Sequence, residues 1–197
     1  MGARLALEAS AARLVGRLSR AAGRGGGTTL PGKLVWKLDP AAVDALAARL
    51  HQGVALVSAT NGKTTTTAMA SSILAPTRIL AWNNSGANLA SGITSTLLNA
   101  DGADLGLLEV DEFALPEVMR RTHPRVVCLG NLFRDQLDRY GELEHIAERW
   151  RAAVAGLDGE ATLVANADDP RVATSVASRS SPATAARQRS AMCSSSP

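Results

Sequence analysis

The stretch that decides the fold is Val54-Ala55-Leu56-Val57-Ser58-Ala59-Thr60-Asn61-Gly62-Lys63-Thr64-Thr65-Thr66-Thr67. Its first five residues are an apolar run of strand type, Asn61-Gly62 marks a tight turn, and a helix is expected from Lys63 onward. A lysine has the unfavourable sign at the N-terminal end of a helix unless an anion lies beside it. Because backbone N–H groups at such an end bind anions, the stretch predicts a phosphate cradle. The competing interpretation is an ordinary strand–turn–helix junction.

Individual side chains of this stretch suit the binding of a nucleotide and a magnesium ion. Lys63 can reach the β- and γ-phosphates, and the hydroxyl of Thr64 is placed to ligate Mg²⁺. The predicted nucleotide-binding loop is completed by Thr60, Asn61, Gly62 and Thr65. One position departs from the usual P-loop spacing, which would put a glycine at Val57.

Apolar runs alternate with helical segments after this loop. Strands are expected at residues 54–58, 78–81, 105–110, 125–129 and 162–164. Helices are expected at residues 63–74, 89–99, 115–121 and 143–156. The alternation predicts an α/β fold of P-loop type, a mostly parallel sheet flanked by helices. In such sheets, ligands bind outside the carboxyl ends of the strands.

Further polar residues follow the expected strands. Asn88 ends a polar loop after the second strand, and Glu109 ends the third. Glu109 stands where a second Mg²⁺ ligand belongs, because hard cations prefer carboxylate and hydroxyl oxygens; a solvated acid is the alternative. Lys63 and Glu109 are therefore the predicted catalytic residues. After the fourth strand, the candidate substrate-binding or supporting residues are Asn131, Arg134, Asp135, Gln136 and Asp138. The alternative interpretation of this stretch is a helix-capping surface loop.

The segment before the cradle, residues 1–50, is expected to be a separate N-terminal unit. It combines a basic amphipathic helix at 3–20, a glycine-rich connector at 23–27, an extended piece at 35–38 and a short helix that starts at Asp39 and runs to Leu50. The basic helix either packs on the domain or rests on anionic lipid, so peripheral membrane contact through the N-terminus is the second interpretation.

The end of the chain differs in kind. Residues 171–197 hold eight Ser, six Ala and four Arg but no Leu, Ile, Phe or Gly, and they are predicted to be disordered. Since the change is abrupt, our hypothesis is a shifted reading frame in a longer gene. The nucleotide sequence downstream of codon 170 would test it.

Charge and cysteine usage narrow the class of protein. Residues 1–37 carry a net charge of +6, residues 38–170 a net −7 and residues 171–197 a net +4. The acidic middle gives no reason to expect nucleic acid as a partner. The two cysteines, Cys128 and Cys193, form neither a disulfide framework nor a metal knuckle. With no apolar run near the roughly 18 residues of a membrane span, a cytoplasmic protein is expected.

The motifs resemble the Mur ligase superfamily. Residues 58–65 are similar to its ATP-binding loop, in which a glycine would stand at Ala59. Residues 131–140 resemble its Asn-…-Asp-His-Leu-Asp-Arg-His block, and Asn166-Ala167-Asp168-Asp169 resembles its Asn-Ala-Asp-Asp turn. On this resemblance, residues 51–170 correspond to the family's central ATP-binding domain, in incomplete form.

Three stretches resemble the MurT branch, the synthetase subunits of lipid II isoglutaminyl synthase. They are Gly86-Ala87-Asn88, Glu109-Val110-Asp111-Glu112 and Phe133 to Glu142. The resemblance implies ATP and Mg²⁺ as cofactors, lipid II as substrate and a GatD-like glutaminase subunit as partner. The implied reaction in peptidoglycan biosynthesis is amidation of the α-carboxylate of D-glutamate to D-isoglutamine. Asn88 would then lie near the nucleotide or the substrate.

Departures from the wider superfamily limit the resemblance. Gln136 stands in place of a metal-binding histidine, Arg151 lies near the place of a carbamylated lysine, and no lysine follows Lys63. These departures favour an ammonia-using amidotransferase over an amino-acid-adding Mur or folylpolyglutamate-type ligase. The family's zinc ribbon has no cysteine ligands in this sequence, and its C-terminal domain has no counterpart. The chain is therefore expected to be an ATP-binding fragment, and an inactive nucleotide-binding module is the third reading.

Overall fold

The computed structural model describes residues 29–83, 87–133 and 142–177 of the chain. Along this part of the chain the elements are α2 (Leu30–Leu38), α3 (Ala42–Ala47), β1 (Val54–Ser58), α4 (Lys63–Leu74), β2 (Leu80–Trp82), α5 (Ala90–Leu98), β3 (Leu105–Glu109), α6 (Leu115–Thr122), β4 (Val126–Leu129), α7 (Glu142–Ala155), β5 (Thr162–Ala165) and α8 (Pro170–Val176). The predicted strands and the helices between them are confirmed, most of them to within one residue at each end. The second strand is the exception, since it starts two residues later than expected.

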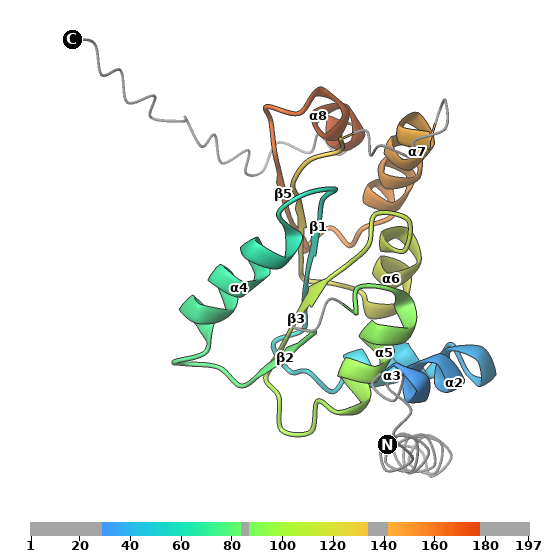
Figure 1. Cartoon of the computed structure of the whole chain (residues 1–197), viewed down its shortest axis with the longest axis vertical. Helices are drawn as coiled ribbons and strands as arrows, with labels where there is room; N and C mark the ends of the chain where they lie inside the picture. Colours follow the sequence, from blue (N-terminus) through green and yellow to red (C-terminus); the bar gives the residue numbers. More distant parts are fainter. Residues whose placement is uncertain (1–28, 84–86, 134–141, 178–197) are drawn as a thin grey trace.

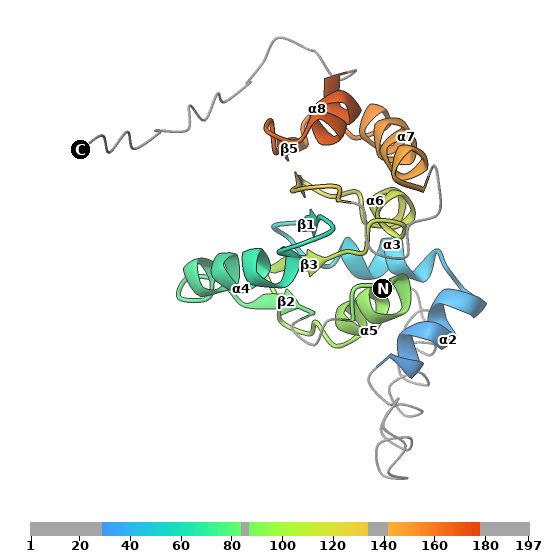
Figure 2. The same cartoon turned by 45° about the horizontal axis from the view of Figure 1, so that its top comes forward.

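The strands form one parallel sheet in the order β2-β3-β1-β4-β5. The chain moves one way across the sheet from β1 to β2 and then the other way through β3, β4 and β5. Because such crossovers are right-handed, this reversal puts α4 on one face of the sheet and α5, α6 and α7 on the other (Figures 1 and 2). The predicted fold class, a mostly parallel α/β sheet of P-loop type, is confirmed.

The sheet and the helices enclose an aliphatic core. The strands contribute fully buried side chains such as Leu56, Leu108 and Val127, and the helices on the α5–α7 face contribute Ile93 and Trp150. Strands buried on both faces read as continuous apolar runs, which is why the run at β1 was recognisable as a strand without alternation. The core thus holds the carboxyl ends of β1 and β3 side by side, with Val57 paired to Glu109.

The N-terminal part differs from the expectation at two points. Residues 35–38 are helical rather than extended, because they belong to α2, whose Val35 is buried. Gly32 lets this helix approach α5 closely, since a Cβ there would lie 1.9 Å from the carbonyl oxygen of Ser91. The helix expected from Asp39 to Leu50 is shorter, since α3 covers Ala42–Ala47. Asp39 ends α2 instead, and its N–H donates to the carbonyl of Val35 at 2.8 Å.

The expected disorder at the C-terminal end is wrong for residues 171–176, which form most of α8. The carboxylate of Asp169 caps this helix by accepting bonds from the N–H groups of Arg171 (2.9 Å) and Val172 (3.2 Å). The helix packs on α7, where Val172 is fully buried and the hydroxyl of Ser175 donates to the carbonyl of Ala147 at 3.0 Å. The composition of the segment did not predict this helix cap or the buried contact of Val172.

The remaining terminal predictions lie outside the described residues. They concern the basic helix at 3–20, the glycine-rich connector at 23–27 and the tail at 178–197. Among the helices of the described part, none is long and apolar enough to cross a bilayer.

Candidate functional site

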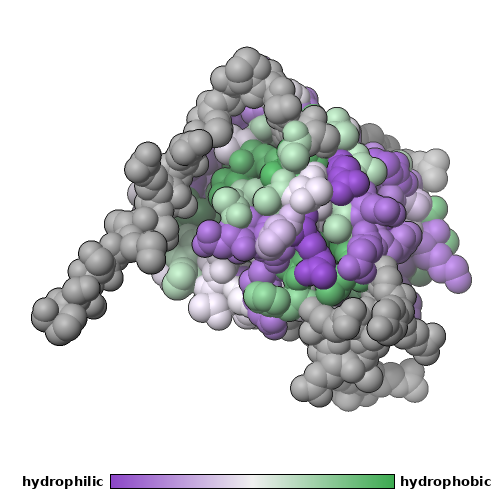
Figure 3. Space-filling model, turned by 90° about the horizontal axis from the view of Figure 1, so that it is seen from above, coloured by the Kyte–Doolittle hydropathy of each residue, from purple (hydrophilic) through white to green (hydrophobic). Residues whose placement is uncertain are grey.

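The loop after β1 is held in shape by its backbone and by the neighbouring strand. Gly62 adopts a left-handed conformation, with a φ of 82°, and is the N-cap of α4. A side chain is strained in this conformation, so glycine is required where the chain turns into the helix. The hydroxyl of Ser58 donates to the carbonyl of Val110 at 2.9 Å and ties the start of the loop to the end of β3. Figure 3 shows the surface of the molecule from above the view of Figure 1, where hydrophilic and hydrophobic side chains lie next to one another.

The ammonium of Lys63 is at the centre of the loop. It donates to the carbonyls of Ala59 and, at 3.3 Å, Thr60, and to the carboxylate of Glu112 at 2.9 Å. The Lys63 side chain is 11% exposed and that of Glu112 is 13% exposed, so the pair is largely withdrawn from water. The lysine therefore lies folded over its own loop, with its charge matched by an acidic residue from the β3–α6 connection.

Glu112 is a site residue that the sequence prediction missed. The backbone carbonyl of Glu112 accepts a 2.9 Å hydrogen bond from the indole Nε1–H of Trp150, a fully buried residue of α7. This contact holds the backbone of Glu112 in place. The signal that could have found Glu112 is its place in the acidic run that directly follows β3, beside the predicted cradle.

The loop after β4 clamps the cradle from the other side. The side-chain amide of Asn131 accepts a bond from the N–H of Asn61 at 3.0 Å and donates to the carbonyl of the same residue at 3.2 Å. The carbonyl of Asn131 accepts from the N–H of Thr60 at 2.7 Å, and the N–H of Phe133 donates to the Thr60 hydroxyl at 3.1 Å. Asn131, predicted as a substrate-binding or supporting residue, thus contacts the predicted nucleotide-binding loop directly.

Asp169 braces this second loop. Besides capping α8, its carboxylate accepts a 2.7 Å hydrogen bond from the N–H of Leu132, and both residues are buried. The Asn-Ala-Asp-Asp turn after β5 therefore supports the loop after β4, which in turn supports the loop after β1.

A change of Asn131 to Ala is expected to lower the free energy of unfolding by about 1–2 kcal/mol, because it removes two hydrogen bonds that define the turn at Asn61. Chemical denaturation of the full chain measures this loss. Asn99→Ala is the matched control, since the Asn99 amide donates to Ser95 within its own helix at 2.7 Å, away from the cradle. Equal stability of the Asn131 variant and the wild type would contradict the clamp.

Among the predicted site residues that the structure describes, Glu109 is the most buried, at 3% exposure. Its backbone N–H donates to the side-chain oxygen of Asn83 at 2.8 Å, and its carbonyl accepts from the Asn83 amide at 2.7 Å. The carboxylate accepts a bond from the side-chain amide of Asn88 at 3.2 Å. The structure therefore brings Asn88 and Glu109 together, one strand away from the cradle, as the strand order requires.

The other predicted site residues fall into two groups. Thr64 and Thr65 lie exposed on the first turn of α4, next to Lys63. Outside the described residues lie Arg134, Asp135, Gln136 and Asp138. The assignment of all these residues to nucleotide, metal or substrate stays a prediction.

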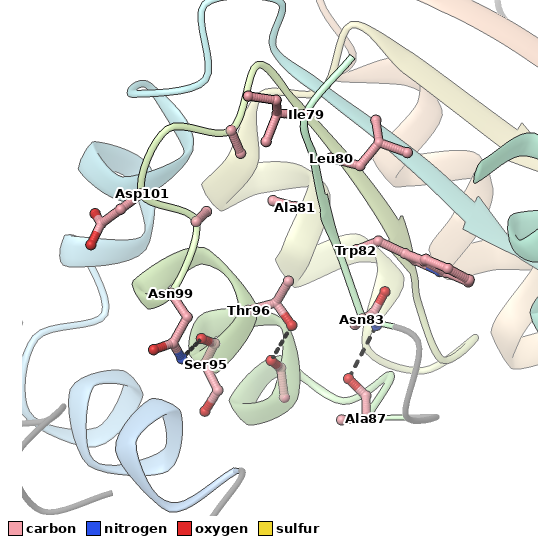
Figure 4. Close-up of a pocket in the computed structure, with 13 residues that line it drawn as sticks. Ile79, Leu80, Ala81, Trp82, Asn83, Ala87, Ser95, Thr96, Asn99 and Asp101 are labelled. Carbon is pink, nitrogen blue, oxygen red and sulfur yellow. Dashed lines mark hydrogen bonds between the residues drawn. The ribbon is translucent and has the colours of Figure 1, made fainter. Parts of the chain in front are cut away.

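Two surface grooves lie away from the cradle. One, of about 410 Å³, runs along β2 and α5, where Figure 4 shows the amide of Asn83 directed at the carbonyl of Ala87. The other, of about 460 Å³, lies between α7 and α8 and is lined by Glu144, Glu148 and Arg151 among others. Neither groove contains Lys63.

In the described part of the chain, the cradle included, no three His, Cys, Asp or Glu side chains gather to hold a metal ion. Burial raises the pKa of the Cys128 thiol, so this cysteine stays protonated at neutral pH and is a poor nucleophile.

Comparison with known proteins identifies the family. Residues 57–190 match the Mur ligase middle domain, which covers the cradle, the β3 and β4 strand ends and the turn after β5. The chain belongs to the Mur ligase family. One curated relative is the MurT subunit of lipid II isoglutaminyl synthase (glutamine-hydrolyzing) from Staphylococcus aureus strain N315. It is 35% identical to this chain over 164 residues. This alignment covers 82% of the present chain and 37% of the relative.

Two further comparisons agree. The MurT subunit from Streptococcus pneumoniae strain R6 is 36% identical over 152 residues, with 74% of this chain and 33% of the relative covered. The solved MurF ligase of Thermotoga maritima, in complex with ADP, superposes with a TM-score of 0.62 at 21% identity, over 74% of this chain and 34% of MurF. The Mur ligase fold is thereby shown. The chain spans about a third of the length of the MurT relatives that it matches.

Proposed function

We propose that this chain is the ATP-binding part of an ATP-dependent carbon–nitrogen ligase that amidates the α-carboxylate of D-glutamate in the lipid II stem peptide. The observation that carries the proposal is the ammonium of Lys63 at the centre of a loop that opens into α4, one strand from the buried carboxylate of Glu109. A helix N-terminus and a lysine suit the β- and γ-phosphates of ATP, and a nearby carboxylate suits the Mg²⁺ ion that accompanies them.

The proposed reaction has two steps. The γ-phosphoryl group of ATP passes to a carboxylate oxygen of D-glutamate, which leaves ADP and an acyl phosphate. Ammonia then attacks the acyl carbon, the carbon–oxygen bond to phosphate breaks, and inorganic phosphate and a proton leave the amide product. Phosphoryl transfer depends mostly on positioning and charge neutralisation, and both fall to Lys63 and to the N–H groups around Gly62.

The donor set at the cradle fits Mg²⁺. This ion is usually held by one or two carboxylates together with substrate phosphates and retains several waters, so Thr64 and Glu109 would be the protein groups that hold it. When bound, it would neutralise charge on the phosphates. The half-buried amide of Asn88 donates to Glu109 and would orient the carboxylate for this task.

Glu109→Gln is expected to leave the fold intact and to weaken the Mg²⁺ dependence of ATP binding, because it keeps the size of the side chain but removes its charge. The apparent affinity for Mg²⁺ in the presence of ATP is expected to fall roughly tenfold, as for other residues around metal sites. Isothermal titration at several Mg²⁺ concentrations measures it. Glu117→Gln is the matched control, because Glu117 pairs with Arg120 and Arg121 on α6. An unchanged Mg²⁺ dependence in the Glu109 variant would remove this residue from the metal site.

The proposed substrate and partner follow from the relatives. Two MurT subunits that resemble this chain are named as parts of a glutamine-hydrolyzing lipid II isoglutaminyl synthase. We therefore propose a glutaminase subunit as the ammonia source. We also propose a cytoplasmic location, as expected from the sequence.

Amidation assays test the reaction. A ligase that contains this ATP-binding part, combined with a glutaminase subunit, is expected to convert D-glutamate-containing lipid II to its isoglutamine form with glutamine, ATP and Mg²⁺ present. Product formation only when a free amino acid is added would favour an amino-acid-adding ligase instead. Binding of Mg²⁺ and ATP without any amide product would leave a nucleotide-binding module.

A further inference from the structure

The contact between Lys63 and Glu112 has a consequence for ligand binding. An ammonium has three donors, and the three acceptors around Lys63 are the carbonyls of Ala59 and Thr60 and the carboxylate of Glu112. The donors of the lysine are therefore already used by the protein. A phosphate oxygen can gain a direct bond from Lys63 only if one of these acceptors gives up its own.

Glu112 is the acceptor that a phosphate displaces most readily. Both carbonyls belong to the loop that carries the lysine, so they remain beside it whatever binds. The carboxylate comes from a separate segment and carries the same charge sign as a phosphate, so the two repel each other at short distance. The low exposure of both side chains makes this repulsion stronger than it would be in water.

We infer that Glu112 is the counter-ion of Lys63 until a phosphate group arrives, and that it then releases the ammonium to the phosphates. Glu112 is thus a positioning residue that sets the affinity of the cradle, a role that rests on the proposed function of this site as the ATP-binding loop. The hydrogen bond from Trp150 to the Glu112 carbonyl holds the backbone of the residue in place, so that only its side chain has to move.

This role predicts opposite effects of Glu112→Gln on stability and on affinity. The amide can still accept a bond from Lys63, but the charge that competes with phosphate is lost. The variant is expected to melt at a lower temperature than the wild type without ligand, yet to bind ATP with Mg²⁺ roughly three- to thirtyfold more tightly. Thermal melts and titration calorimetry of the full chain measure both quantities. A side chain that only stabilised the fold would lower the melting temperature without raising the affinity.

Chemical labelling of lysines provides a readout that does not depend on ATP. The chain contains three lysines, and Lys33 and Lys37 lie exposed on α2. Acetic anhydride, followed by peptide mass spectrometry, is expected to modify Lys63 more slowly than the two α2 lysines in the wild type. In Glu112→Ala, acetylation of Lys63 is expected to accelerate several-fold, while Lys33 and Lys37 serve as internal controls. Equal rates at Lys63 in the wild type and the variant would overturn the inference.

A second probe separates this inference from the proposed function. Tripolyphosphate carries the phosphates of ATP without the nucleoside, so it tests the exchange at Lys63 alone. Tighter tripolyphosphate binding by Glu112→Gln, in a chain that does not respond to ATP, would support the counter-ion role and refute the nucleotide function. Weaker or unchanged binding of both ligands by this variant would overturn the counter-ion role. A wild-type chain that binds neither ligand would overturn both proposals.

Discussion

Lys63→Ala is expected to abolish the stabilisation that ATP and Mg²⁺ confer on this chain. The lysine is the positive charge at the centre of the cradle, and alanine leaves only backbone N–H groups to hold the phosphates. At a ligand concentration about 100 times the dissociation constant, the wild type gains about 2.7 kcal/mol, or roughly 5–10 °C in melting temperature. The variant is expected to show no measurable shift relative to its own ligand-free melt. Thermal melts with and without ATP and Mg²⁺ measure the effect.

Lys37→Ala is the matched control for this experiment. Lys37 is an exposed lysine in the last turn of α2, outside the cradle, so its removal is expected to leave the ligand-dependent shift intact. The comparison with the variant's own baseline matters, because Lys63→Ala also leaves the carboxylate of Glu112 without its partner. An unchanged shift in Lys63→Ala would refute the assignment of the cradle.

Trp150→Ala is expected to cause the largest loss of stability among the changes considered, about 3–5 kcal/mol. Trp150 is a fully buried side chain of α7, and its indole N–H also holds the backbone carbonyl of Glu112. The change removes a large apolar volume and leaves a cavity between α7 and the β3–α6 connection. Differential scanning calorimetry is expected to show a melting temperature lower by roughly 10 °C.

Trp150→Phe separates the two roles of this residue and remains informative if the alanine variant does not fold. Phenylalanine keeps most of the apolar bulk but cannot donate to Glu112. It is expected to cost about 1–3 kcal/mol and to raise the acetylation rate of Lys63 by loosening the counter-ion. An alanine variant within 1 kcal/mol of the wild type would contradict the burial of this side chain.

Local sequence patterns predicted most of the fold. Runs such as residues 126–129 are apolar throughout and lie between turn residues, so their strand character did not depend on the rest of the chain. The predictions failed where packing decided the outcome. Residues 35–38 are helical because α2 packs on α5, and residues 171–176 are ordered because α8 packs on α7. Neither partner surface can be recognised from composition.

The candidate site was predictable only in part for a similar reason. Gly62 and Lys63 follow from turn and helix chemistry within a few residues, and Glu109 follows from its position at a strand end. Glu112 was missed, because acidic residues at helix starts and in connections are common on protein surfaces. Its role emerges from the pairing with Lys63 and from the bond that it receives from Trp150.

Local sequence patterns were enough to predict a strand–turn–helix unit with a lysine at the N-terminal end of its helix, and a parallel sheet that places other strand ends nearby. These features depend on periodicity and turn residues, which act over short distances along the chain. The tertiary structure decided which charge neutralises Lys63 and which amide fixes Asn61. Those contacts join residues 49 and 70 positions apart, and they exist because the strand order β2-β3-β1-β4-β5 puts the ends of β3 and β4 on either side of β1.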